Sequence, residues 1–189
     1  MRTPIKTANT LIGKIIKKES IIISDKNMAG FKLHPIFKNL NGEELDYVLL
    51  PVYEASLENN KLTSIANVKP TSNINILDAE SYAANRGEGW HITNLAAESV
   101  NQMLQVVEYG TMNIESEIGP GVVNITTDTS SNHASMTGST ASIGNGTGIA
   151  TSTINDGTEY TSQSKCAICY RGMENPWGNI WHMIGGLLI

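Results

Sequence analysis

The clearest hydrophobic pattern in the chain lies between residues 95 and 109. Apolar side chains recur there at intervals of three and four residues, which predicts an amphipathic helix with one apolar face against the core. Asn94 is a suitable N-cap, Glu98 falls in the first turn where the helix dipole favours an acid, and Gly110 is a suitable stop. The positions of this apolar face are Ala96, Val100, Met103, Leu104 and Val107.

A second, shorter helix is predicted over residues 79–86. Asp78 is its expected N-cap, and Gly87 stands where a helix-ending glycine belongs. Ahead of the helices, residues 30–56 have the pattern of strands, of which 45–53 is the clearest and follows an Asn-Gly turn signal. The pattern as a whole predicts an α+β fold, in which two helices pack on short antiparallel strands.

The chain changes character between residues 119 and 164. Serine, threonine, glycine and asparagine dominate this segment, which contains no lysine or arginine. Its large apolar side chains are too few to form a core of their own. We therefore expect a polar insertion that loops out of the domain, and long loops on a rigid scaffold often carry binding function.

The segment at residues 170–181, YRGMENPWGNIW, is dense in residues with special conformational or packing demands. Pro176 fixes its backbone φ, and Gly172 and Gly178 permit unusual dihedrals. The tryptophan rings bring large apolar areas that favour burial. We expect a tight turn that leads into a strand and holds the centre of the domain. The residues to which we assign this structural role are Arg171, Glu174, Asn175, Trp177, Asn179 and Trp181, together with Trp90 and with Glu108 as a buried ion-pair partner of Arg171.

Five blocks of the chain, in the same order, resemble those of bacteriophage minor structural and tail-fibre proteins. The resemblance implies a C-type-lectin-like domain, similar in fold to the formylglycine-generating enzymes. It also implies a virion protein that is assembled in the host cytoplasm, acts outside the cell and contacts other virion proteins, as a homo-oligomer that is a trimer in many fibres. The blocks are GFKLHPIF (30–37), YVLLPVYEAS (47–56), RGEGWH (86–91), VEYGTMN with IGPG (107–113 and 118–121), and YRGMENPWGNIW (170–181).

Length and charge limit the classes of protein to consider. The chain has 189 residues, which predicts one domain at 30–189, interrupted by the insertion at 119–164, with an N-terminal arm or attachment segment at 1–29. The net charge of −5 argues against a nucleic-acid-binding surface. No apolar run approaches the roughly 20 residues that span a bilayer, and lysines interrupt every apolar run near the N-terminus, so we expect neither membrane insertion nor a signal peptide.

Catalytic and metal-binding patterns are weak in this sequence. Cys166 and Cys169 form a single C-x-x-C pair without the further ligands of a zinc site, so we expect ordinary buried thiols. The four histidines do not stand at the spacing of a metal motif, and no G-x-S-x-G elbow exists. We expect no cofactor, no metal and no enzymatic activity. A copper-dependent oxidase remains as an alternative through the fold analogy alone.

These expectations together favour an adhesin of the tail fibre, baseplate or head fibre. It would bind a bacterial surface receptor, a glycan in preference to a protein, through side chains of the polar insertion. A virion decoration or assembly protein without receptor binding is the main alternative. The residues expected to contact the ligand are Asn132, His133, Asn145, Asp156 and Tyr160.

Overall fold

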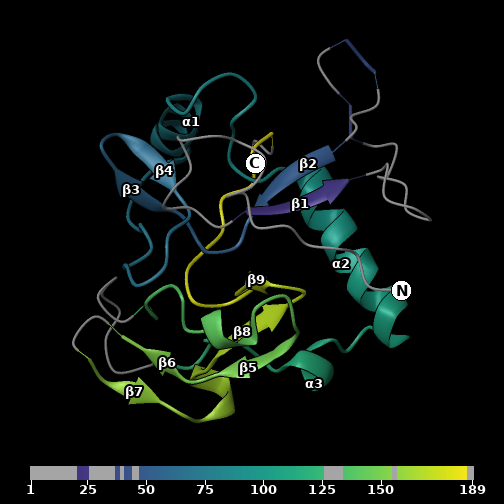
Figure 1. The fold of residues 1–189 in the computed structure, drawn as a ribbon, viewed down its shortest axis with the longest axis vertical. Coiled ribbons are helices and arrows are strands. Elements are labelled where there is room, and N and C mark those ends of the chain that lie inside the picture. Colours follow the sequence, from purple (N-terminus) through teal and green to yellow (C-terminus); the bar gives the residue numbers. More distant parts are fainter. Residues whose placement is uncertain are drawn as a thin grey trace.

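The structure is a computed structural model that describes residues 21–25, 37–38, 41–43, 47–125, 134–154 and 157–186. Figure 1 shows strands β5 to β9 gathered in one part of the molecule, α1 with β3 and β4 in another, and α2 along one side. The described part combines helices with small antiparallel sheets, which agrees with the α+β class. Apart from residues 21–25, the predicted arm lies outside the described residues.

Most strands form short antiparallel pairs. The clearest predicted strand is confirmed as β2, although it is shorter than the sequence pattern, and Leu49 in it stands opposite Ile23. The strand pairs are β1 (Ile21–Asp25) with β2 (Tyr47–Pro51), β3 (Ser56–Glu58) with β4 (Lys61–Thr63), and β6 (Ser152–Thr153) with β7 (Glu159–Tyr160).

The largest sheet among the described residues is β5–β8–β9, formed by Gly148–Ala150, Ala167–Tyr170 and Met173–Glu174. β8 is the central strand, and its sequence Ala-Ile-Cys-Tyr is apolar throughout, as expected of a strand buried on both faces. Its four residues are all buried. The hairpin of β8 and β9 therefore gives the C-terminal motif a rigid base.

Both predicted helices exist, and the longer one has the predicted ends. α2 runs over Leu95–Tyr109, Asn94 caps it by accepting a hydrogen bond from the Ala97 amide, and Gly110 ends it in the left-handed region. α1 spans Ile76–Ala84, so the prediction of Asp78 as its N-cap is wrong. Asn75 is the cap, because its side-chain oxygen accepts from the Asp78 backbone amide while its side-chain nitrogen donates to the Asp78 carboxylate.

The predicted orientation of α2 is wrong. Its apolar face points outward: Met103 is 64% exposed and Val107 is 79% exposed. Gln105, on the opposite side of the helix, is only 1% exposed. The inward face is held by polar contacts, since the Asn101 amide lies 3.7 Å from the Met173 sulfur and Glu108 bonds to the β8–β9 hairpin.

The described part of segment 119–164 does not loop out of the domain. It supplies β5, which pairs directly with β8, and the short helix α3 (Glu115–Ile118) precedes it and packs on β8. The Thr137 hydroxyl donates to the Ile65 carbonyl at 2.7 Å and accepts from the Val68 amide at 3.1 Å. Small polar side chains here form interior hydrogen bonds, so this segment needs few apolar residues to be ordered.

Candidate functional site

The C-terminal motif begins with a tight turn between β8 and β9. Arg171 and Gly172 both have positive φ, 49° and 85°, as a two-residue type I′ turn requires. The Arg171 amide donates to the Thr147 hydroxyl at 3.0 Å, and the Gly172 amide donates to the Gly146 carbonyl at 3.0 Å. The turn is thus tied to the described part of the polar segment.

Two asparagines of the motif hold distant stretches of backbone. The Asn175 amide donates to the Ile168 carbonyl at 2.8 Å, and its side-chain oxygen accepts from the Ile168 amide at 3.2 Å. Asn179 holds Ser135 in a similar way, with its side-chain oxygen 2.7 Å from the Ser135 amide and its side-chain nitrogen 3.2 Å from the Ser135 carbonyl. Both asparagines have positive φ, which asparagine tolerates better than most residues.

Glu54 joins these two asparagines to the end of the chain. The side-chain amides of Asn175 and Asn179 both donate to its Oε2. Its Oε1 lies 3.3 Å from Nε2 of His182, and the Glu54 side chain is only 5% exposed. The hydrogen bond to Glu54 raises the pKa of His182, and the charge of Glu98 adds to this effect. Sequence reasoning missed both residues, although they lie in or beside family-like blocks.

A cavity of about 760 Å³ opens beside this cluster. Its walls come from segments far apart in the sequence, including the residues before α1, the start of α2 and the motif. The volume is typical of a small-molecule site. The polar residues around it include Glu54, Asn94, Glu98, Asn101, Asn179 and His182.

The three tryptophans differ in burial, and none is as buried as the size of its ring predicts. Trp177 is half-buried and its ring nitrogen donates to the Pro120 carbonyl at 3.2 Å. Trp90 is also half-buried, with the Arg86 guanidinium 3.9 Å from its ring centroid. Trp181, in contrast, lines the cavity and is 99% exposed. The expectation of burial is wrong for Trp181. The expected strand after the turn is present as the two residues of β9, and positive φ at Gly178 and Asn179 interrupts extended backbone further along the motif.

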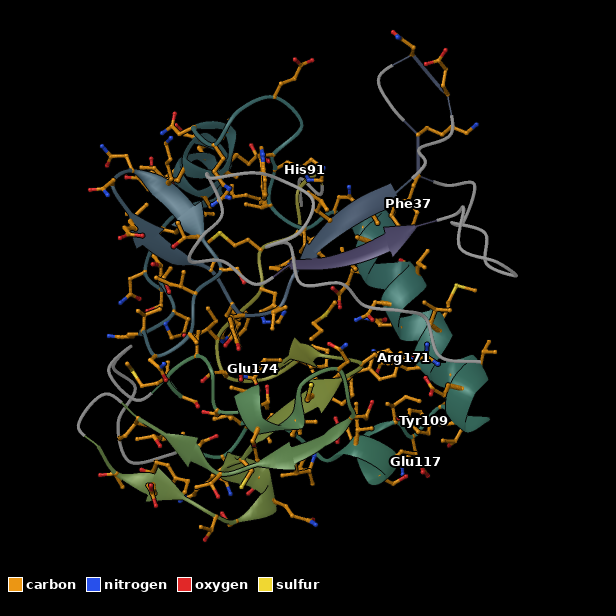
Figure 2. All side chains as sticks on the ribbon, viewed as in Figure 1. Phe37, His91, Tyr109, Glu117, Arg171 and Glu174 are labelled. Carbon is orange, nitrogen blue, oxygen red and sulfur yellow. The ribbon has the colours of Figure 1, made fainter. Side chains whose placement is uncertain are left out.

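The predicted pairing of Glu108 with Arg171 is confirmed, but the pair is not buried. Arg171 Nε lies 2.8 Å from Glu108 Oε2, and each side chain is about one-third exposed. The Tyr170 hydroxyl donates to the same oxygen at 2.7 Å. The hydrogen bond from Arg171 is the main cause that lowers the pKa of Glu108. Figure 2 shows Arg171 reaching from the hairpin toward α2, near Tyr109.

Glu174, also predicted as a motif residue, is buried, and Figure 2 labels it near β9, above the strands of the polar segment in this view. Its Oε1 accepts from the Gly138 amide at 2.9 Å, and its Oε2 accepts from the amide and the hydroxyl of Thr140, each at 2.7 Å. Burial raises the pKa of this carboxyl, while these hydrogen bonds act in the opposite direction. Glu174 therefore anchors residues 138–140 on the hairpin.

The structure does not bring together the residues of the polar segment that were expected to bind a ligand. Asn132, His133 and Asp156 lie outside the described residues. Asn145 sits against the turn glycine, since a Cβ added to Gly172 would be 3.3 Å from its Cα. Tyr160 lies on β7 with the Lys165 ammonium 5.0 Å from its ring centroid. Neither Asn145 nor Tyr160 lines the cavity.

The two cysteines are buried free thiols, as predicted. Cys169 Sγ donates to the Gly146 carbonyl at 3.3 Å, and Cys166 Sγ donates to the Tyr160 carbonyl at 3.5 Å. Burial raises the pKa of both thiols. In the part of the chain that the structure describes, no three of the His, Cys, Asp and Glu residues form a metal-binding group.

None of the helices among the described residues is long and apolar enough to cross a membrane. The sequence matches no protein-family model and no curated protein.

Proposed function

We propose that this chain is a bacteriophage virion protein that attaches to a bacterial surface, with the cavity beside Trp181 as its binding site for a glycan. The observation that carries the proposal is the exposure of Trp181, a residue that is 99% exposed at a cavity of about 760 Å³. An exposed indole offers a flat apolar surface on which a sugar ring can stack. A solvent-exposed tryptophan at a cavity is also typical of a binding hot spot.

The polar lining supports a polyhydroxylated ligand. Asn94, Asn101, Glu98 and His182 line the same space and carry groups that donate or accept hydrogen bonds, whereas the side chain of Asn179 is already held by Ser135 and Glu54. Neutral amides and paired charges suit the many hydroxyl groups of a sugar, which both donate and accept. The assignment to a virion rests on the resemblance of the sequence blocks, not on the cavity.

The experiment is binding of the labelled, purified chain to intact cells of candidate host bacteria, compared between the natural sequence and Trp181→Ala. Because Trp181 is exposed, its replacement should leave the thermal unfolding temperature unchanged. Loss of a hot-spot tryptophan is expected to weaken saturable binding by about 30-fold, equivalent to about 2 kcal/mol. Met112→Ala, at another exposed apolar residue away from the cavity, is the matched control.

Deletion of the polar segment is a poor test of the same question. Residues 128–160 include β5, which pairs with β8, and the buried residues Ser135 and Thr140. Such a deletion should unfold the domain and remove binding for that reason alone. Saturable binding that survives Trp181→Ala would reject the cavity as the site, and Asn145 and Tyr160 would then be substituted next.

A virion decoration or assembly protein is the second candidate. It predicts no saturable binding to any host cell by a folded sample of the natural sequence. The oxidase alternative is disfavoured by the burial of Cys166 and Cys169, because redox and metal chemistry at cysteine requires an accessible thiolate.

A further inference from the structure

Among the described residues, three acidic side chains line the cavity, and the fold already uses two of them. Glu54 accepts from two asparagine side chains at Oε2 and contacts His182 at Oε1. Glu174 accepts hydrogen bonds from the polar segment at both of its oxygens. The carboxylate of Glu98 differs, because within the described part of the chain it accepts one hydrogen bond, from the Gln102 side chain to Oε1 at 3.1 Å. Its Oε2 is therefore available to a ligand.

Glu98 lies near the segment that carries Trp181. It stands in the first turn of α2, and the Gly185 amide donates to the Thr93 carbonyl, just before that helix, at 2.7 Å. The chain from Trp181 to Gly185 therefore ends against the start of α2. The charge of Glu98 also acts on His182, which follows Trp181 in the sequence. A ligand that stacks on Trp181 thus lies within the field of this carboxylate.

Positive charge is scarce on the cavity wall. Among the lining residues that the structure describes, Arg86 is the one lysine or arginine. Its guanidinium lies 3.9 Å from the ring centroid of Trp90, and its Nη1 donates to the Leu62 carbonyl at 2.7 Å. A sugar with a carboxylate or a phosphate group would meet the acids Glu54 and Glu98 in the same cavity. Like charges brought together repel, so the wall selects against acidic sugars.

We infer that the cavity selects a sugar with a free amino group, whose ammonium pairs with Glu98 while the sugar ring stacks on Trp181. This inference rests on the proposed function, since it names the class of glycan that the same site takes. A carboxylate and an ammonium form charge-assisted hydrogen bonds, which are stronger than those of a neutral hydroxyl. The face of an exposed indole also attracts a cation, and tryptophan does so better than the other aromatic residues.

The first test is the affinity of the full natural chain for short β-linked oligomers of glucosamine, N-acetylglucosamine and glucose, measured by calorimetry. The three oligomers differ at one ring position, which carries an ammonium, an acetamide or a hydroxyl group. At about pH 6 the amine is protonated and the carboxylate is ionised. The glucosamine oligomer should bind about 10-fold more tightly than the other two, equivalent to about 1.4 kcal/mol. The preference should shrink as salt rises from about 0.01 M to about 1 M, because salt screens the charges.

The variant Glu98→Gln tests the carboxylate. It keeps an oxygen that can accept from Gln102 but removes the charge, so the ratio of the glucosamine affinity to the glucose affinity should fall to about one. Glu115→Gln makes the same change at an exposed acid of α3 that does not line the cavity, so the ratio should stay at about 10-fold. Equal unfolding temperatures for the two variants would show that both are folded.

Four results would overturn the inference. The natural chain binds the three oligomers equally, it binds none of them, or Glu98→Gln keeps the preference. The fourth is an oligolysine peptide that displaces the glucosamine oligomer as well as the free oligomer does, because the site would then recognise charge without the sugar.

Failure of the selectivity differs from failure of the proposed function. If binding to host cells is lost in Trp181→Ala but the natural chain binds the three oligomers equally, the glycan site stands and its selectivity for an amine is rejected. If binding to host cells survives Trp181→Ala, the cavity itself is rejected as the site.

Discussion

Arg171 and Glu108 lie 63 positions apart in the sequence, and their side chains are 2.8 Å apart in the fold. Arg171 lies in the turn between β8 and β9, and Glu108 belongs to the last turn of α2. Tyr170, the neighbour of Arg171, donates to the same carboxylate oxygen. This one carboxylate therefore joins the inward side of α2 to the motif hairpin.

Replacement of this carboxylate should destabilise the fold in a pH-dependent way. Glu108→Gln is expected to lower the free energy of unfolding by about 1 kcal/mol near neutral pH, since the pair is partly exposed and one hydroxyl hydrogen bond is weakened with it. Because Arg171 lowers the pKa of folded Glu108, the stabilisation exists above the unfolded value of about 4.3 and is lost as the pH falls through the lower, folded value. Urea unfolding of both proteins near neutral pH and at about pH 3 measures this difference.

The difference between the two proteins should shrink at the acidic pH. A difference that stays constant down to about pH 3 would mean that the carboxylate charge does not contribute. Glu117→Gln, at an exposed acid on the neighbouring helix α3, is the control for a simple change of net charge.

The anchoring of the polar segment by Glu174 should depend on the Thr140 hydroxyl. Thr140→Val removes one hydrogen bond to a buried carboxylate, and such bonds are worth about 1.5–3 kcal/mol. We expect a loss of about 2 kcal/mol in unfolding free energy, with faster hydrogen exchange at the Gly138 amide. Thr140→Ser keeps the hydroxyl and loses a methyl group, so it should cost about 1 kcal/mol and preserve the slow exchange. Equal exchange rates in the two variants would contradict the anchoring role.

Gly178 in the motif should not tolerate a side chain. It has a φ of +81°, and an added Cβ would lie 3.1 Å from the Val122 nitrogen and 3.2 Å from the Val122 oxygen. Gly178→Ala should therefore cost about 2–3 kcal/mol, from the sum of backbone strain and crowding. Gly110→Ala is the matched control, because its φ of +67° is also positive but its Cβ would meet nothing within 4 Å. It should cost about 1 kcal/mol, so similar unfolding midpoints for the two variants would exclude crowding at Gly178.

The contact of His182 with Glu54 should weaken as the pH rises. Glu54 and Glu98 raise the pKa of His182, so its stabilisation is fully present below the unfolded value of about 6.5 and is lost as the pH rises through the higher, folded value. The natural chain should therefore lose stability relative to His182→Gln between about pH 5.5 and about pH 8.5 in urea unfolding. His91→Gln, which leaves the Glu54 contact intact, should follow the natural chain. A parallel response of His182→Gln and the natural chain would show that the charge on this histidine is not coupled to folding.

The sequence by itself determined the features that depend on neighbouring residues. The ends of α2 follow from Asn94 and Gly110, which satisfy the free backbone groups of the helix within one turn. The start of α1 was missed by three positions, yet its signal is local as well, in the spacing of Asn75 and Asp78. The residue chemistry also indicated the pairing of Glu108 with Arg171 before the fold was known.

Only the tertiary structure decided which surfaces face inward and which residues meet. The hydrophobic pattern of α2 identifies two faces of a helix, but Asn101 and Glu108 find their partners 72 and 62–63 positions away, and these bonds turn the polar face inward. Glu54 and His182, which meet beside the cavity, are likewise 128 positions apart in the sequence. Local hydrogen bonds can be read from neighbouring residues, whereas burial and long-range contacts depend on how the whole chain closes on itself.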